Sequence, residues 1–240
     1  MNAHEVRFAG REEIAAGTMA FHFEKPAGFS FKPGQVIDLI LVNPPSADAA
    51  SGRHAFSLVS APFQSTLTIA TRLRDSAFKR ALQGLPIGAP ARLEGPFGSL
   101  TLHGNHARPA VFIAGGIGIT PFMSILRQAA QDQLPQRLIL LYSNRRPEDA
   151  AFLAELQELE RYNRNFRLVA TMTEMHKSSS PWRGATGPID RDLVSGVGKE
   201  LASPIYYVAG PPSMVAGLRQ TLARAGINDD DVRSEEFYGY

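Results

Sequence analysis

Three glycines in the second half of the chain could form an anion-binding turn. Gly115, Gly116 and Gly118 follow four apolar residues with the β-branched and aromatic content of a buried strand, and Thr120 and Pro121 come next. Pro121 has the preset φ of a first helical turn, so the pattern predicts strand, turn and helix. Backbone N–H groups there could bind a phosphate or pyrophosphate. The glycines could equally serve close packing, and the spacing is neither GxGxxG nor a Walker loop, which disfavours ATP hydrolysis.

A second set of chemically useful side chains lies in the run Arg53–Pro62, RHAFSLVSAP. The period of a strand would place His54 and Phe56 on one face and Ser57 on the other. An aromatic ring, a hydroxyl and cations at one strand end could bind a flat heterocycle that carries phosphates. Phe56 would stack on the heterocycle and Ser57 would donate a hydrogen bond to it. The alternative is an ordinary strand that begins with solvated basic residues.

Short strands and turn signals alternate through the first hundred residues, which predicts a small antiparallel β-barrel or sandwich. One helix is expected there, running from Ser76 to about Gln83. The expected strands are Val6–Ile14, Met19–Glu24, Gln35–Val42, Ala55–Ser60, Leu67–Leu73 and Ala91–Leu93.

From Pro109 onward strands alternate with helices, which predicts an α/β doubly wound parallel sheet. We therefore expect two domains, a β-barrel at residues 1–105 and an α/β domain at 106–240, with Lys177–Gly187 as an exposed loop. Ligands of such sheets bind outside the carboxyl ends of the strands. The strands expected are Ala110–Ala114, Arg137–Ser143, Phe166–Thr171, Ile205–Ala209 and Val232–Phe237, and the helices are Thr120–Gln131, Ala151–Arg161 and Ser213–Ala225.

Composition excludes several kinds of protein. Hydrophobic residues make up 44% and charged residues 20% of the chain, as in an ordinary globular protein. A net charge of +2 and scattered basic residues argue against nucleic-acid binding. Without cysteine the chain can form no disulfide, no thiolate-bound iron–sulfur cluster and no cysteine nucleophile. We predict no metal site, no signal peptide and no membrane span, and we expect a cytoplasmic protein.

The ordered motifs of the two halves resemble those of the ferredoxin–NADP reductase superfamily. They are RHAFSLVS, GPFG, GGIGITP, YYVAGPPSMV and a terminal EEFYGY, and together they cover essentially the whole chain. The resemblance implies an FAD-binding β-barrel followed by an NAD(P)-binding domain. It also implies that a hydride passes from nicotinamide to the flavin N5 atom between the two.

By this resemblance, His54, Phe56 and Ser57 occupy the arginine, aromatic and serine positions of the family's Arg-x-Tyr-Ser flavin motif. Arg53 is one residue early, which leaves either Arg53 or His54 to bind the flavin phosphates. The run is similar to the His-Pro-Phe-Ser/Thr variant of ferric-reductase-like members. Ser76 would contact phosphate at its helix start or simply cap the helix. The flavin-binding residues implied are Arg53, His54, Phe56, Ser57, Leu58 and Ser76.

In the second half, the glycine turn resembles the pyrophosphate turn for a pyridine nucleotide, with Thr120 near the nicotinamide. Tyr207–Pro212 resembles the family's Cys-Gly-Pro-Pro segment with Ala209 in place of the cysteine, a change that could slow hydride transfer without abolishing it. The nucleotide-binding residues implied are Gly115, Gly116, Gly118, Thr120, Pro121, Ser143, Arg145, Arg146, Ala209, Gly210 and Pro211.

The C-terminal run resembles the end of plant-type members, where an acid precedes a tyrosine that stacks on the flavin. Glu236 takes the acid position and Tyr238 the stacking position, with Tyr240 as a rival. The catalytic residues implied are Ser57 and Glu236. The alternative is an edge strand followed by frayed aromatic residues.

Residues after the second strand of the α/β domain bear on the choice of dinucleotide. An acid there would accept hydrogen bonds from the ribose of NAD, whereas hydroxyl and guanidinium donors suit the 2′-phosphate of NADP. Ser143, Arg145 and Arg146 are donors, and the acids Glu148 and Asp149 are expected to begin the next helix. The sequence therefore favours NADPH over NADH, with solvated turn arginines as the alternative.

We expect an FAD-dependent NAD(P)H oxidoreductase that delivers electrons to a separate ferredoxin, flavodoxin or oxygenase component. Because the chain has no cysteine, an iron–sulfur or haem centre would belong to that partner. A ferric-chelate or free-flavin reductase, which uses a small-molecule acceptor, is the enzymatic alternative. A non-catalytic flavin- or nucleotide-binding module is the alternative from another class, and Ala209 is the residue that favours it.

Overall fold

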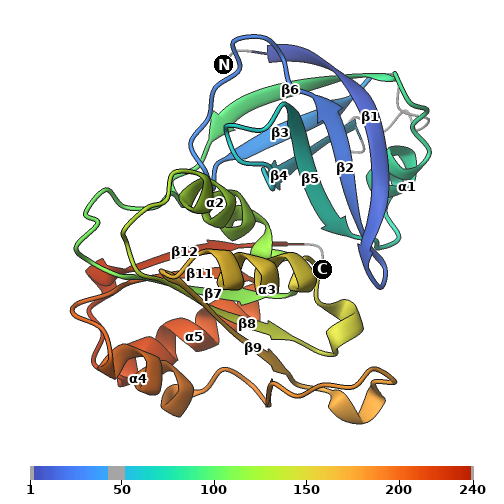
Figure 1. The fold of residues 1–240 in the computed structure, drawn as a ribbon. Helices are drawn as coiled ribbons and strands as arrows, with labels where there is room; N and C mark the ends of the chain where they lie inside the picture. The colour runs from blue at the N-terminus through green and yellow to red at the C-terminus, as the bar shows by residue number, and fades with distance from the viewer. Residues whose placement is uncertain (1–2, 43–51, 239–240) are drawn as a thin grey trace.

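The computed structural model describes residues 3–42 and 52–238, which form a β-barrel followed by an α/β domain (Figure 1). The last barrel strand ends at Phe97 and the first strand of the second sheet begins at Ala110. Among these described residues, no helix has the length and hydrophobicity to span a membrane.

Six antiparallel strands in the order β4-β3-β6-β1-β2-β5 make the barrel. An isolated bridge between Leu58 and Ile69 joins the two end strands, and the Val59 N–H donates to the Thr68 carbonyl at 2.8 Å. Phenylalanine rings fill much of the interior, which agrees with the alternation seen in the sequence. The elements are β1 (Ala3–Ala15), β2 (Thr18–Glu24), β3 (Val36–Leu41), β4 (Arg53–Ser57), β5 (Thr66–Arg72), α1 (Ala77–Gln83) and β6 (Pro90–Phe97).

The second sheet is parallel throughout, with the order β10-β9-β8-β7-β11-β12. Helices α2 and α3 cover one face and α4 and α5 the other, and α2 also lies next to the barrel (Figure 1). The elements are β7 (Ala110–Gly115), α2 (Thr120–Gln131), β8 (Leu138–Asn144), α3 (Leu153–Tyr162), β9 (Phe166–Met172), β10 (Ala185–Thr186), α4 (Arg191–Lys199), β11 (Ile205–Gly210), α5 (Pro212–Arg224) and β12 (Val232–Glu236).

Both faces of this sheet are buried, which explains the continuous apolar runs in its strands. In β7, Phe112 packs in the cluster under α2 and α3, whereas Val111 and Ile113 pack in the cluster under α4 and α5. Every residue of β7 is buried. The sequence prediction of a two-domain fold, with an antiparallel barrel before a doubly wound parallel sheet, is confirmed.

Two elements escaped the sequence prediction, α4 and the short strand β10. Gly196 and Gly198 lower the helix propensity of α4, and only Val194 and Val197 of its nine residues are buried. Asp190 nevertheless caps the helix, since its side chain accepts a hydrogen bond from the Leu193 N–H at 2.9 Å. Strand β10 has two residues and lies within the segment that was expected to be a loop.

Candidate functional site

The predicted phosphate turn lies at the carboxyl edge of the second sheet. β7 ends at Gly115, and a 3-10 turn leads from there into α2. Gly116 has a φ of +54°, and a Cβ at this position would meet no atom within 4 Å. A Cβ at Gly118 would instead lie 2.3 Å from the carbonyl oxygen of Ala209. The two interpretations of the glycines, anion binding and close packing, therefore apply to different residues. Gly116 faces open space, where an anion could approach, and Gly118 permits close packing on β11.

Thr120 and Pro121 are both buried in the first turn of α2. The Thr120 hydroxyl donates a hydrogen bond to the Ile117 carbonyl at 3.1 Å, so this side chain helps to fix the shape of the turn. At the end of β11, Ala209 is completely buried, and the Gly210 carbonyl accepts a hydrogen bond from the backbone of the C-terminal segment at 2.9 Å. Pro211 then precedes α5. The structure thus brings the two predicted nucleotide loops together at one edge.

The polar side chains at the end of β8 differ in whether they are already paired within the protein. Arg146 donates two hydrogen bonds of 2.8 Å to Asp149, and this contact lowers the pKa of the Asp149 carboxyl. Arg72 of the barrel also approaches Asp149, at 3.6 Å. Ser143 is half-buried, and Arg145 is exposed and takes part in none of the ion pairs found between described residues. Arg145 is therefore the arginine without a direct acidic partner among the described residues, whereas the charge of Arg146 is already balanced.

Glu148 and Asp149 do not begin the next helix, contrary to the sequence prediction. They lie in a separate 3-10 turn, Pro147–Asp149, and α3 starts at Leu153. Phe152, immediately before α3, has a φ of +60°, which interrupts the helix on its N-terminal side.

The cationic start of β4 is occupied by local contacts. Arg53 donates a hydrogen bond of 2.9 Å to Asp38 and pairs with Glu94 at 3.0 Å. The His54 ring stacks on Phe56 with centroids 4.8 Å apart and an interplanar angle of 25°. Phe56 is itself only 7% exposed and packs in the barrel core. Of the two candidate phosphate cations, His54 is the one that is free of an acidic partner among the described residues.

Ser76 and Leu58 also make internal contacts. The Ser76 hydroxyl accepts a hydrogen bond from the Lys79 N–H at 3.2 Å and so caps α1. Arg80 pairs with Asp75, the acid next to that cap. Leu58 is completely buried, and its N–H donates to the Gln35 carbonyl at 2.9 Å.

A pocket of about 240 Å³ lies between β4 of the barrel and the end of β12. Ser57 and Glu235 both line it, and the Ser57 Oγ and one Glu235 carboxylate oxygen are buried without a hydrogen-bond partner among the described residues. Burial raises the pKa of the Glu235 carboxyl to about 7. Unpaired buried polar atoms are costly, so this pocket fits a ligand with polar edge atoms, as a flavin has. The lining residues are Val36, His54, Ala55, Phe56, Ser57, Glu235, Glu236, Phe237 and Tyr238.

The sequence prediction singled out Glu236, and the structure adds Glu235, the acid whose carboxylate is buried in the pocket. Glu236 is exposed and accepts a hydrogen bond of 2.5 Å from the hydroxyl of Tyr238, which is 71% exposed. The alternation of β12 was the available signal, because Arg233 and Glu235 share its less exposed face. Tyr240, the rival stacking residue, lies outside the described residues.

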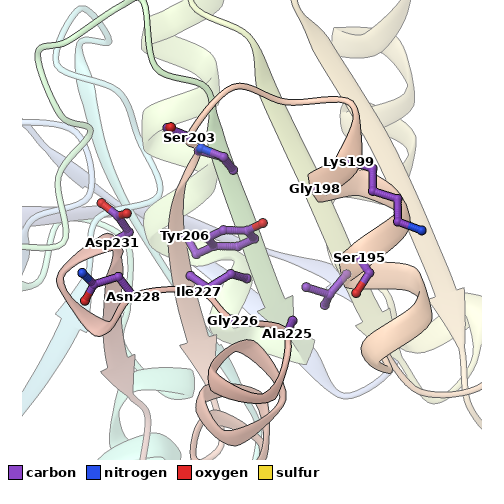
Figure 2. A pocket seen from close by; sticks show the side chains of 12 residues that line it. Ser195, Gly198, Lys199, Ser203, Tyr206, Ala225, Gly226, Ile227, Asn228 and Asp231 are labelled. Carbon is purple, nitrogen blue, oxygen red and sulfur yellow. The ribbon is translucent and has the colours of Figure 1, made fainter.

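Another cavity, of about 480 Å³, lies at the opposite edge of the second sheet. Figure 2 shows Tyr206, near the start of β11, between Lys199 of α4 and Asn228 after α5. Tyr206 begins the YYVAGPPSMV run, but none of the predicted site residues lines this cavity. We therefore place the candidate site at the carboxyl edge and in the pocket beside β4.

Comparison with known proteins bears on the class of protein. A family model described as the oxidoreductase NAD-binding domain matches residues 112–220. The chain is 30% identical over 217 residues to the reductase component of propane 2-monooxygenase from Rhodococcus jostii (strain RHA1), covering 89% of this chain and 57% of the relative. It is 29% identical over 234 residues to ferredoxin–NADP reductase B from Sorangium cellulosum (strain So ce56), covering 93% and 92%.

A solved structure has the same fold over almost the whole chain. The crystal structure of a ferredoxin NADP⁺ reductase from Neisseria gonorrhoeae with bound FAD and NADP matches with a TM-score of 0.79 and 23% identity, covering 98% of both chains. The chain spans between 57% and 61% of the length of five monooxygenase reductase relatives.

The fold and these relatives support one class of protein, the NAD(P)H-dependent flavoprotein reductases. Within that class, the family match and the Sorangium cellulosum relative support the ferredoxin–NADP reductase superfamily, and the Neisseria gonorrhoeae structure shows that the chain has the corresponding fold.

The contact between the glycine turn and β11 predicts a specific stability loss. Gly118→Ala should destabilise the protein by about 1–3 kcal/mol, because its Cβ would collide with a backbone carbonyl that has little room to move. Gly217→Ala in α5 is the matched control, because a Cβ there meets no atom within 4 Å and alanine favours the helix by about 0.5–1 kcal/mol. Denaturant unfolding of both variants measures the difference, and equal effects would contradict it.

The burial of Glu235 predicts a pH-dependent stability. The pKa of this carboxyl rises from 4.5 in the unfolded chain to about 7 in the fold, so its contribution is intact below pH 4.5 and falls as the pH rises through 7. As the pH rises from 4.5 to 7, the native protein should lose up to about 3 kcal/mol of unfolding free energy, and Glu235→Gln, whose amide does not ionise, should not show this loss. Unfolding free energies from pH 4.5 to 8 measure this loss. Glu236→Gln is the exposed control, and parallel profiles for native protein and Glu235→Gln would refute the prediction.

Proposed function

We propose that the chain binds FAD between β4 and β12, reduces it with NADPH in preference to NADH, and passes the electrons to a separate acceptor. The observation that carries the proposal is the pair of partnerless polar atoms, on Ser57 and Glu235, in one pocket. The barrel contributes the first and the α/β domain the second. A ligand that satisfied both would therefore be bound by both halves of the protein. We also propose the domain boundary between residues 105 and 106.

FAD bound in this pocket would supply the hydride-accepting chemistry. The Ser57 hydroxyl would donate a hydrogen bond to the polar edge of the ring, at a position that the surrounding barrel fixes. Glu235, whose pKa is about 7, would hold a proton near neutral pH. We propose for Glu235 the acidic role that the family resemblance implied for Glu236. His54 and the exposed face of α1 would border the phosphate end of the ligand.

The nucleotide would bind across the carboxyl edge of the second sheet, with its pyrophosphate against the turn at Gly116. Arg145 supports the preference for NADPH, because it is the exposed guanidinium at the end of β8. Ser143 would add a hydroxyl donor on the same strand. Asp149 is paired with Arg146 and is therefore not free to accept from the ribose of NADH.

A protein acceptor is favoured over a small molecule by the relatives, which include the reductase component of a propane 2-monooxygenase and a ferredoxin–NADP reductase. The sequence has no cysteine, so any thiolate-bound iron–sulfur cluster would lie outside these 240 residues. We propose that the acceptor is a ferredoxin, a flavodoxin or an oxygenase component.

Anaerobic mixing tests the proposed function. The purified protein with FAD should be yellow, and NADPH should bleach it at least several times faster than NADH at equal concentration, because the 2′-phosphate adds binding to Arg145. Stopped-flow absorbance at the flavin maximum measures both rates. A colourless protein that takes up no FAD would overturn the flavin site, and a yellow protein that neither nucleotide bleaches would make it a non-catalytic module.

Removal of one guanidinium tests the nucleotide preference. Arg145→Ala should weaken NADPH binding by about tenfold to a hundredfold, the value of one charge-assisted hydrogen bond, and leave NADH binding nearly unchanged. Dissociation constants from titration of the oxidised nucleotides measure the effect. Arg164→Ala, another exposed arginine of the α/β domain, is the control. An equal loss for both nucleotides would show that Arg145 does not read the 2′-phosphate.

A further inference from the structure

One face of α2 connects the two cofactor regions. Thr120, Ser124 and Arg127 follow one another at spacings of four and three residues, so they lie on the same side of the helix. Thr120 belongs to the turn at the nucleotide edge. Ser124 and Arg127 contact the barrel, which lies beside this helix in Figure 1.

The contacts of these two side chains are with the segment that follows Ser57. The Ser124 hydroxyl donates a hydrogen bond to the Ser60 carbonyl at 2.7 Å, and Ser124 is completely buried. The Arg127 guanidinium donates to the Val59 carbonyl at 3.0 Å. Two consecutive carbonyls just after the flavin motif are thus bound by one helix.

Arg127 is held in place by a third element. Its guanidinium makes a bidentate pair with Glu155 of α3, with N···O distances of 2.6 and 2.7 Å, and lies 5.5 Å from the centre of the Phe152 ring. The Arg127 side chain is only 16% exposed. A planar guanidinium with fixed partners on both edges allows little movement of the group it binds.

The bound segment is also rigid on its barrel side. The Val59 N–H donates to the Thr68 carbonyl at 2.8 Å, and the Ser60 hydroxyl accepts from the Thr68 N–H at 3.0 Å. Val59 and Ser60 are both almost completely buried. A displacement imposed by α2 would therefore be transmitted to the end of β4 at Ser57 and not absorbed by a loose loop.

We propose that Ser124 and Arg127 are positioning residues for hydride transfer, which hold the chain after Ser57 at a fixed distance from the helix that follows the nucleotide turn. The inference rests on the proposed function. Hydride transfer depends steeply on the approach of the two reacting atoms, and a misplacement of about 1 Å can cost about a hundredfold in rate. Neither side chain needs to touch either cofactor for this effect.

The test compares binding with reduction in the FAD-loaded protein. Arg127→Ala should slow flavin reduction at saturating NADPH at least tenfold, while the dissociation constants of FAD and NADP⁺ stay within threefold of the native values. A lysine at this position can reach Glu155 or the Val59 carbonyl but not both. Arg127→Lys should therefore reduce its flavin at a rate between those of the native protein and Arg127→Ala, and it replaces the alanine variant in the test if that variant does not fold. Ser124→Ala should slow reduction about threefold.

Arg137→Ala removes an arginine that pairs with Glu200 away from the barrel and is the matched control. Ser57→Ala is the reference for a change within the pocket. A saturated rate for Arg127→Ala within twofold of native would overturn the inference, and so would loss of FAD in proportion to the loss of rate, which would assign Arg127 a purely structural role. Native protein that no nucleotide bleaches would overturn the proposed function instead, and this is observed before any variant is made.

Discussion

The close approach of Gly118 to the carbonyl of Ala209 is the contact on which the site depends. It brings the turn after β7 against the end of β11, and β11 pairs with β12, which carries Glu235. Because only glycine allows this approach, the two predicted nucleotide loops and the Glu235 side of the proposed flavin pocket share one fixed geometry. Helix α2 starts at the same turn and contacts the barrel through Ser124 and Arg127. The turn therefore positions both halves of the candidate site.

The fold could be predicted from sequence because its patterns are local. A short apolar run before the glycine turn, a proline in the first helical turn and alternation in the barrel strands each specify an element without knowledge of its neighbours. Helix α4 was not predicted because its two glycines lower its helix propensity. Its buried residues, Val194 and Val197, are buried only by packing in the assembled domain.

The candidate site was predicted less completely, since its chemistry depends on partners that are distant in sequence. The spacing of the motifs indicated Arg53 and Arg146 as cations. The fold brings Asp38 and Glu94 to Arg53 from distant parts of the chain, whereas Arg146 pairs with Asp149, three residues further on. Glu235 and Glu236 are adjacent and chemically identical, and the twist and pairing of β12 decide which one is buried. Ser57 was predicted to donate a hydrogen bond to a ligand, and only the three-dimensional structure shows that its buried hydroxyl has no partner among the described residues.

The Asp149 carboxylate interacts with an arginine of each domain. It accepts two hydrogen bonds from Arg146 at the nucleotide edge and lies 3.6 Å from Arg72 at the end of barrel strand β5. An incoming phosphate that drew Arg146 away would leave Asp149 to Arg72 alone and tighten the contact between the domains. By thermodynamic reciprocity, anything that strengthened that contact would in turn favour phosphate binding at Arg146. The Asp149 carboxylate would therefore couple the affinity for a phosphate at Arg146 to the association of the two domains.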